Sequence, residues 1–207
     1  MEAWLVRHGE TAWNQAWRFQ GARDVELLER GREQAERLAE ALVGQGLEAL
    51  YTSPLARCRE TAAACASRLG LHPVPVVDLR EVGLGDWEGL TVDTVVERDG
   101  DHYWRWLTTP GDHPPPGGEP MGALQRRVTA AIEAIRARHP AGRVGIVTHG
   151  GAIASALCGY LGLGLNAVWR LRIDNTSVTR VALPVGRLQS LNDTRHLETV
   201  APRAGTP

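Results

Sequence analysis

An arginine and a histidine stand side by side, as Arg7 and His8, at the end of an apolar segment in the stretch LVRHGET at positions 5–11. Two cationic side chains repel each other when both are charged, so the pair suits a site in which an anion lies between them. The formal net charge of the chain is -1, which gives no general attraction to nucleic acid or to a membrane surface. We therefore expect a local anion site and no basic surface.

Three further residues that could serve this site follow apolar segments or begin a helix. Glu81 comes after VVDLR, His149 comes after VGIVT, and Arg57 falls in the first turn of an expected helix. In open α/β sheets, ligands bind beyond the carboxyl ends of the strands, where loops and helix N-termini gather. With Arg7 and His8 these side chains would form an electropositive cup, which fits the acceptor oxygens of a phosphate better than a carboxylate.

A phosphate in this cup would allow His8 to act as a nucleophile. If one ring nitrogen donates a hydrogen bond to a backbone carbonyl, the other presents a lone pair to phosphorus, and attack gives a phosphohistidine. Phosphoryl transfer depends mainly on positioning and charge stabilisation, which Arg7, Arg57 and His149 could supply around the equatorial oxygens.

The alkoxide that departs in such a transfer needs a proton. Glu81 in REVGLGDWEG is our choice for the acid, because an acidic group beside a dianion tends to keep its proton near neutral pH. Asp78, Asp86 and Glu88 lie in the same part of the chain and are rivals that the sequence alone leaves open.

Apolar segments alternate with amphipathic ones along the chain, which predicts a layered α/β fold with a mostly parallel sheet. We expect a surface excursion at 98–119, where Trp104, Trp106 and the run HPPPGG argue against a continuous element. The helix at 53–70 should begin with Ser53 as N-cap and Pro54 as its first residue. Expected strands are 3–6, 48–53, 71–77, 143–148, 168–174, 177–183 and 187–191, and expected helices are about 31–42, 53–70, 121–139 and the segment after His149.

Composition is that of an ordinary globular protein, with 43% hydrophobic and 23% charged residues. Cys58, Cys65 and Cys158 lack metal-ligand spacing and are expected to be buried thiols in a reducing compartment. The first residues do not resemble a signal peptide and no segment approaches the roughly 20 apolar residues of a membrane span. We therefore expect a cytoplasmic protein.

Six stretches occur in the order and approximate spacing typical of one family: LVRHGETAWN, FQG, YTSPLARCRETA, LREVGLGDWEG, GGEP and VTHGG. On these motifs the chain resembles the histidine phosphatase superfamily, also called the phosphoglycerate mutase-like family, from about residue 3 to residue 197. The resemblance implies that His8 becomes phosphorylated, that Arg7, Arg57 and His149 hold the phosphoryl group, and that Glu81 is the proton donor and later the base.

By the same resemblance, Asn14, Gln20, Gly21 and the backbone at Gly150 should contact phosphate or substrate. It also implies a three-layer α/β/α sandwich with a mostly parallel central sheet, formed by a single domain over residues 1–197, with residues 198–207 as a flexible tail. Family members use no metal, and the remaining histidines show no paired spacing, so we expect neither a metal nor a cofactor.

Two departures from the family pattern bear on function. Pro120 stands where a serine or threonine usually follows GGE, and the chain has no lysine, whereas the true mutases use one to grip a second phosphate. We therefore predict a metal-independent phosphatase for a small phosphorylated metabolite. The alternatives are a cofactor-dependent phosphoglycerate mutase and a non-catalytic sensor of a phosphorylated metabolite. Residues 168–174 and their neighbours could offer an edge strand for a homodimer.

Overall fold

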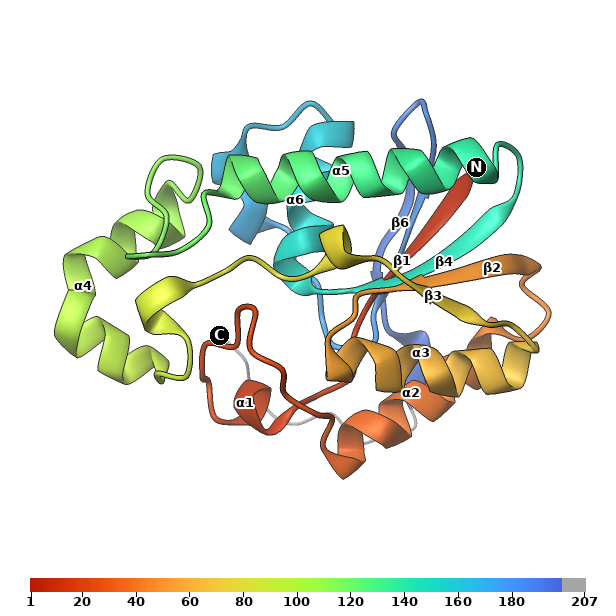
Figure 1. The fold of residues 1–207 in the computed structure, drawn as a ribbon, viewed down its shortest axis with the longest axis horizontal. Coiled ribbons are helices and arrows are strands. Elements are labelled where there is room, and N and C mark those ends of the chain that lie inside the picture. The colour runs from red at the N-terminus through yellow and green to blue at the C-terminus, as the bar shows by residue number, and fades with distance from the viewer. Residues whose placement is uncertain (199–207) are drawn as a thin grey trace.

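Six strands form one mixed sheet in the computed structural model, which describes residues 1–198 (Figure 1). Their order is β3-β2-β4-β1-β5-β6; β3, β2, β4 and β1 are parallel, and β5 and β6 are antiparallel to their neighbours. The strands are β1 (Glu2–Arg7), β2 (Leu47–Thr52), β3 (Pro73–Pro75), β4 (Arg143–Thr148), β5 (Val178–Ala182) and β6 (Arg187–Asp193). The central pair β1 and β4 is fully in register, from Glu2 opposite Arg143 to Arg7 opposite Thr148.

Helices cover both faces of this sheet, with α2 and α3 on one side and α5 and α6 on the other (Figure 1). Alternate side chains of β1 divide between the two layers: Trp4 and Val6 pack with α2 and α3, and Ala3 and Leu5 pack with α5 and α6. The helices are α1 (Ala12–Gln15), α2 (Glu29–Leu42), α3 (Ala56–Leu69), α4 (Val92–Thr108), α5 (Met121–Arg138) and α6 (Gly150–Tyr160). This arrangement confirms the predicted three-layer α/β/α sandwich with a mostly parallel sheet.

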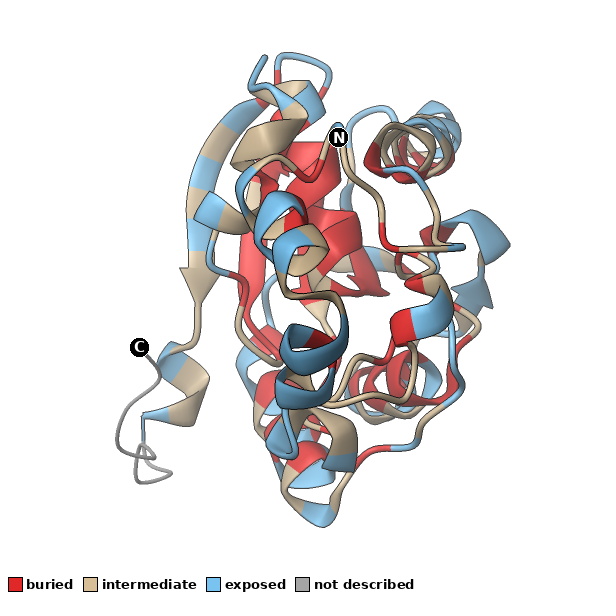
Figure 2. Ribbon diagram, turned by 90° about the vertical axis from the view of Figure 1, so that its left-hand side faces the viewer, coloured by how far each residue is buried: buried red, intermediate tan, exposed pale blue. Residues whose placement is uncertain are grey.

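Burial follows from this layering. Figure 2 shows the central strands and α6 buried, while the outer helices are buried only on their inner side. Helix α6 is rich in small and apolar residues, and eight consecutive positions from Gly151 to Cys158 are buried. The three cysteines are free and buried, as predicted. None of the helices in residues 1–198 combines the length and apolarity needed to cross a membrane.

Three local predictions are wrong. Helix α3 begins at Ala56 with Leu55 as its N-cap, so Ser53 is not the cap; its hydroxyl instead lies 2.8 Å from His149 Nε2. The excursion predicted at 98–119 is helical up to Thr108, because α4 bends at Asp99 and carries Trp106 into the core. Only the following turn-rich segment, before Met121, is irregular.

The predicted strand at 168–174 is a 3₁₀ helix over Leu165–Arg170 followed by irregular chain. Val168 and Leu171 both pack in the core cluster, and their spacing of three residues matches one 3₁₀ turn. Trp169 and Ile173 also pack in or against this cluster, so the alternation of apolar and charged residues here does not mark a strand. The edge strands of the sheet are β3 and β6. The strand predicted at 71–77 is shorter, Pro73–Pro75, and leads into a 3₁₀ turn at Val77–Leu79. Residues 199–207 of the predicted tail lie outside the described residues.

The chain after His8 turns back against the start of α2 through a close contact between two glycines. A Cβ on Gly31 would lie 2.1 Å from the carbonyl oxygen of Glu10, and a Cβ on Gly9 would lie 2.4 Å from the carbonyl oxygen of Gly31. The same carbonyl of Glu10 accepts a 2.9 Å hydrogen bond from the N–H of Leu28. The backbone that directly follows His8 in the chain is thus packed against the start of α2.

We expect Gly31→Ala to lower the free energy of unfolding by about 1–3 kcal/mol, the usual cost of forcing extra atoms into a packed contact. Urea unfolding at neutral pH measures the change. Gly100→Ala is the matched control, since an added Cβ there meets no atom within 4 Å, and it should be neutral or slightly stabilising. Equal free energies of unfolding for the wild type and Gly31→Ala would show that the chain at Glu10 can move away from Gly31 without loss of stability.

Candidate active site

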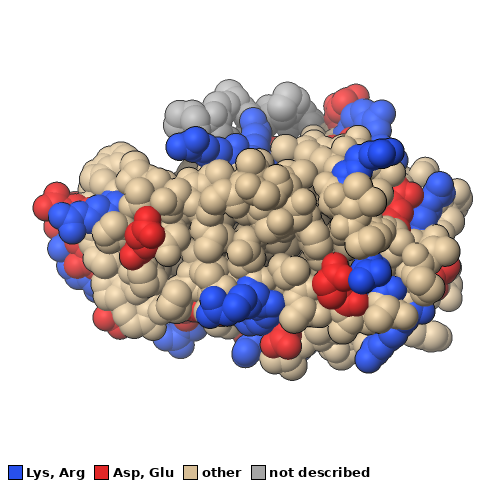
Figure 3. Space-filling model, turned by 90° about the horizontal axis from the view of Figure 1, so that it is seen from above, with Lys and Arg blue, Asp and Glu red and all other residues tan. Residues whose placement is uncertain are grey.

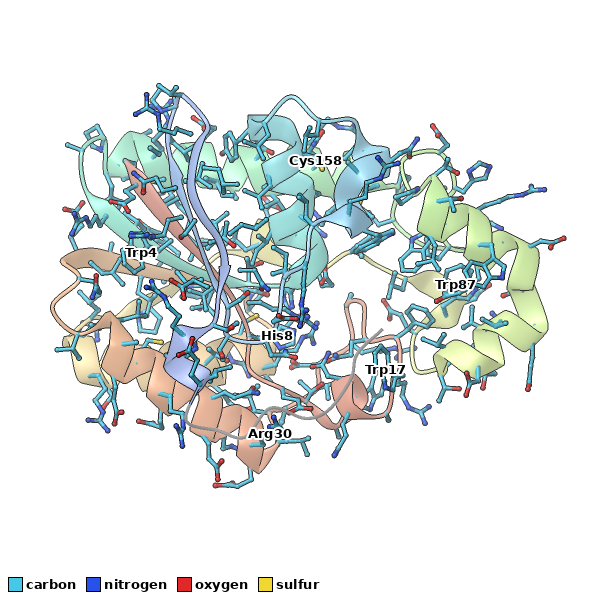
Figure 4. All side chains as sticks on the ribbon, turned by 180° about the vertical axis from the view of Figure 1, so that it is seen from behind. Trp4, His8, Trp17, Arg30, Trp87 and Cys158 are labelled. Carbon is cyan, nitrogen blue, oxygen red and sulfur yellow. The ribbon has the colours of Figure 1, made fainter. Side chains whose placement is uncertain are left out.

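A cavity of about 290 Å³ opens beyond the carboxyl ends of β1 and β4. In Figure 4, His8 lies between the sheet, which carries Trp4, and the segments that carry Trp17 and Trp87. Every residue that the sequence analysis placed in the site lines this cavity except His149: Arg7, His8, Asn14, Gln20, Gly21, Arg57, Glu81 and Gly150. The parallel strand order therefore brings together residues far apart in the chain.

His8 is buried and held in one tautomer. Its Nδ1 lies 2.7 Å from the carbonyl oxygen of Gly9; a carbonyl can only accept, so Nδ1 carries the proton and Nε2 has the lone pair. Burial lowers the pKa of His8 well below its usual value of 6.5, and the nearby charges of Arg57 and Arg7 lower it further. The imidazole is thus neutral at physiological pH, which removes most of the repulsion from Arg7.

Arg7 and Arg57 bring two guanidinium groups into the cavity wall, and both are oriented by carbonyl oxygens. Arg7 donates to the carbonyl of Ile173 at 2.7 Å, while its buried Nε has no hydrogen-bond partner within residues 1–198. Arg57, which is 1% exposed, donates to the carbonyls of Arg23 at 2.7 Å and Gly21 at 2.9 Å. Neither cation has a carboxylate within ion-pair distance among these residues, so the cup favours an added anion.

His149 lies directly behind this cup and is completely buried. Its Nδ1 accepts a hydrogen bond from Arg57 Nε at 3.3 Å, which leaves Nε2 as the donor to the hydroxyl of Ser53 at 2.8 Å. Burial lowers the pKa of His149 well below 6.5, and Arg57 lowers it further. Burial also raises the pKa of the neighbouring Cys58 thiol to about 12, so neither group adds charge. In this structure His149 orients Arg57 and does not line the cavity.

Among residues 1–198, Glu81 is the one carboxylate that lines the cavity, whereas its rivals Asp78, Asp86 and Glu88 do not. Its two oxygens accept backbone N–H groups of Gly151 and Ala152, each at 3.1 Å, in the first turn of α6. A third N–H, from Val82, donates to it at 2.9 Å. A helix N-terminus attracts negative charge, so this position holds the carboxylate firmly against the cup.

An arginine that the sequence analysis missed secures the segment that carries Glu81. Arg127 of α5 donates to the carbonyls of Asp78, Arg80 and Glu81 at 2.7–2.9 Å, and it forms a bidentate pair with Glu119 at 2.7 and 2.8 Å. Glu119 also accepts the N–H of Gly83 at 3.3 Å. Glu119 is therefore a structural partner and does not line the cavity. Helix α5 starts after Pro120 without a side-chain cap, in keeping with the departure seen in the sequence.

The polar residues predicted around the cup have their amide oxygens engaged locally. Asn14 Oδ1 accepts the backbone N–H of Thr11 at 3.1 Å, and Gln20 Oε1 lies 3.0 Å from the Thr11 hydroxyl, which can donate to it. These contacts direct the oxygens away and leave both amide NH₂ groups available as donors to an anion. Gly21 has φ +52°, and a Cβ there would lie 2.2 Å from Glu88. The glycine is therefore required by this turn.

The remaining lining of the cavity forms a largely apolar wall, and the sequence predicted none of it as part of the site. It consists of Phe19, Val82, Leu84, Trp106, Ala154, Trp169, Leu171 and Ile173. Arg18 also lines the cavity; it donates to the carbonyl of Gly89 and lies 5.8 Å from the ring centre of Trp13. Trp106 and Trp169 had been assigned to a loop and to a strand, so nothing in their local sequence placed them here.

Charge is concentrated in the cavity. On the face above α5, acidic and basic side chains are interspersed (Figure 3), whereas the part of the cavity lining that the described residues form has three arginines and one carboxylate. No group of three or more histidine, cysteine or acidic side chains within residues 1–198 could hold a metal ion. The fold and the cup together define an anion-binding α/β protein in which a neutral histidine faces a site suited to a phosphoryl group.

Comparison with known proteins identifies the family. The profile of the histidine phosphatase superfamily (branch 1) matches residues 3–194. Phosphoserine phosphatase 1 of Hydrogenobacter thermophilus is 34% identical over 195 residues, 93% of this chain and 92% of that protein. A probable phosphoglycerate mutase of Yersinia pestis is 34% identical over 210 residues, which cover 97% of each chain. The solved structure of Bacillus stearothermophilus YhfR has a TM-score of 0.89 and 34% identity, and the match covers 95% of this chain and 99% of that one.

The chain belongs to the histidine phosphatase superfamily, as its motifs indicated. It is an enzyme of the phosphatase or phosphoglycerate mutase type. The two relatives are named for different reactions and different substrates. The choice between hydrolysis and the mutase reaction therefore rests on the chemistry of the cavity.

The two buried histidines should make stability fall in mild acid. Their pKa values are lowered in the folded state, so the unfolded chain binds more protons below pH 6.5 and the favourable contribution is lost as the pH falls. Between pH 6.5 and 5, the free energy of unfolding of the wild type should fall as the pH falls. In His149→Gln we expect this fall to be less steep by about 1 kcal/mol per pH unit. Urea unfolding at several pH values measures this; His72→Gln, at an exposed position, should follow the wild type. Parallel curves for all three proteins would contradict a neutral buried His149.

Proposed function

We propose that this protein hydrolyses a small phosphate monoester through a phosphohistidine at His8, without a metal ion. The observation that carries the proposal is the hydrogen bond from His8 Nδ1 to the carbonyl of Gly9. This bond places the proton on Nδ1 and leaves Nε2 with the lone pair that attacks phosphorus. Burial, with the charges of Arg57 and Arg7, lowers the pKa of His8 and keeps the ring neutral.

In the first step the phosphoryl group enters the cup. Arg7 and Arg57 compensate its charge, and the amide groups of Asn14 and Gln20 donate to its oxygens, with the backbone near Gly21 and Gly150 close by. His8 Nε2 attacks, so an N–P bond forms as the bond between phosphorus and the ester oxygen breaks. The departing alkoxide takes a proton from Glu81.

In the second step water replaces the alcohol. Glu81, now a carboxylate, takes a proton from the water as its oxygen attacks phosphorus; the N–P bond breaks and its electron pair returns to Nε2. Inorganic phosphate leaves, and Glu81 has regained its proton. His149 supports both steps by orienting Arg57, and Arg127 does so by holding the backbone around Glu81. Direct contact of His149 with the phosphoryl group stays a prediction.

Hydrolysis is favoured over the mutase reaction by the distribution of charge in the cavity. A mutase must hold a second phosphate while the first is transferred, whereas the lining beyond the cup offers, within residues 1–198, Arg18 as its one further cation. A sensor without turnover is the third candidate, and the presence of both His8 and Glu81 in the cavity argues for catalysis. Three free buried thiols suit a reducing compartment such as the cytoplasm. A homodimer stays a prediction, for which the edge strand β6 is available.

The experiment that tests the function is phosphate release from 4-nitrophenyl phosphate and 3-phosphoglycerate in the presence of a chelator. We expect His8→Ala to lower kcat by at least about 10⁴-fold, as removal of a nucleophile does, while its circular dichroism stays unchanged. His72→Ala should behave as the wild type. A phosphoryl group bound to His8 should be detected by mass spectrometry after rapid quenching under alkaline conditions. No release by the wild type would favour the sensor, or the mutase if a bisphosphorylated primer restores turnover.

The role of Glu81 predicts a dependence on the leaving group. We expect Glu81→Gln to slow hydrolysis of the alkyl ester 3-phosphoglycerate by about 10²–10⁴-fold and that of 4-nitrophenyl phosphate far less, since nitrophenolate departs without a proton. Asp78→Asn is the control, because Asp78 is exposed and does not line the cavity. Equal losses on both esters would mean that Glu81 acts by positioning the phosphate and that another group is the acid.

A further inference from the structure

The lining of the cavity has two parts of different chemistry. One part is the cup of Arg7, His8 and Arg57, together with Glu81. The other part is the apolar wall, for which the side chains that matter here are Phe19, Leu84, Trp106, Trp169, Leu171 and Ile173. A phosphate monoester also has two parts, and the cup takes only the phosphoryl group. The wall is then what the alcohol part of the substrate meets.

The aromatic rings of the wall pack on one another. Trp106 and Trp169 lie 4.8 Å apart between ring centres, and Trp169 Nε1 donates to the carbonyl of Trp106 at 3.3 Å. Phe19 contacts Trp106 at 5.8 Å between ring centres. Trp87, labelled in Figure 4, is completely buried and backs both Phe19 and Trp106 at 5.7 and 5.5 Å. Such a preformed apolar surface binds apolar groups with little loss of conformational entropy.

Charged partners for an ionic alcohol are scarce along this wall. Within residues 1–198, Arg18 is the one ionisable side chain of the lining outside the cup; one of its nitrogens donates to the carbonyl of Gly89, and its guanidinium lies 5.8 Å from the ring centre of Trp13. Glu81 is held by three backbone N–H groups. An alcohol that carries a carboxylate, or an ammonium and a carboxylate, would have to desolvate these groups against tryptophan and leucine side chains, which is unfavourable.

We infer that the substrates this site prefers are phosphate monoesters of uncharged, apolar alcohols, aryl or branched alkyl, whose organic part packs on the wall of Phe19, Trp106, Trp169 and Leu171. This inference rests on the proposed hydrolysis and deepens it. The cavity volume of about 290 Å³ is near the lower end of small-ligand pockets, about 300–1,000 Å³, so the alcohol is of the size of one or two rings. The phosphorylated alcohol leaves as the free alcohol, and the chemistry at phosphorus is unchanged.

The test compares two aryl esters whose phenols have closely similar acidity, 2-naphthyl phosphate and 4-carboxyphenyl phosphate. Matched leaving groups make the chemical step alike, so the ratio of their kcat/KM values reports the contacts of the alcohol part. For the wild type we expect 2-naphthyl phosphate to be favoured by at least about tenfold, the scale on which apolar pockets discriminate. Phosphoserine and 3-phosphoglycerate should be poorer than an uncharged alkyl phosphate such as isoamyl phosphate.

Two substitutions in the wall should change this ratio. Trp169→Ala should lower it by about tenfold, since it removes the ring against which the naphthyl group packs. Leu171→Arg should lower it further or reverse it, because it places a cation at a partly exposed position of the wall. Trp104→Ala is the matched control: Trp104 is 59% exposed and does not line the cavity, so the ratio should stay at the wild-type value.

The outcomes separate the inference from the function. Hydrolysis that depends on His8 but favours 4-carboxyphenyl phosphate, or equal treatment of the two esters, would overturn the apolar subsite while the phosphatase stands. An unchanged ratio in both Trp169→Ala and Leu171→Arg, with circular dichroism showing folded proteins, would do the same. Failure to hydrolyse either ester would instead reject the proposed function, and the inference with it.

Discussion

Two guanidinium groups and a neutral imidazole share a buried space at the end of the central strands. Most of the surrounding structure offsets the unfavourable burial of these two cations. A buried cation without a partner is strongly unfavourable, and Arg57 is almost completely buried. Its partners are the carbonyl oxygens of Gly21 and Arg23 and the ring of His149. Partial negative charges orient the guanidinium without neutralising it, so its net charge remains available to an anion.

Several otherwise unrelated features serve this arrangement. The turn at Gly21 requires a positive φ and a missing Cβ, and it presents the carbonyl that Arg57 needs. The Ser53 hydroxyl, displaced from its expected role as a helix cap, accepts from Nε2 of His149, whose tautomer is fixed by the hydrogen bond that Arg57 donates to Nδ1. The contact between Gly9 and Gly31 holds the backbone next to His8. Each of these features positions a residue of the site.

The helix layers contribute in different ways. Helix α6 offers its N-terminal N–H groups to Glu81, and α5 holds the preceding backbone through Arg127. Helix α4 stands at one end of the sandwich (Figure 1) and supplies Trp106 to the wall of the cavity. The cup therefore rests on the central sheet and its flanking helices, while Trp106, Trp169 and Leu171 of the apolar wall come from α4 and the segment before β5.

The sequence by itself determined the layered α/β fold, the family and the members of the cup, because each depends on short-range patterns: apolar strands that end in Arg7, His8 or His149, and motifs in a fixed order. The choice of Glu81 over Asp78, Asp86 and Glu88 needed the tertiary structure, since only packing against α6 decides which carboxylate reaches the cavity. Arg127 and the tryptophan wall were also decided there. Their partners lie many residues away in the chain, and the helix at 92–108 and the 3₁₀ turn at 165–170 form because their apolar side chains pack on that distant core.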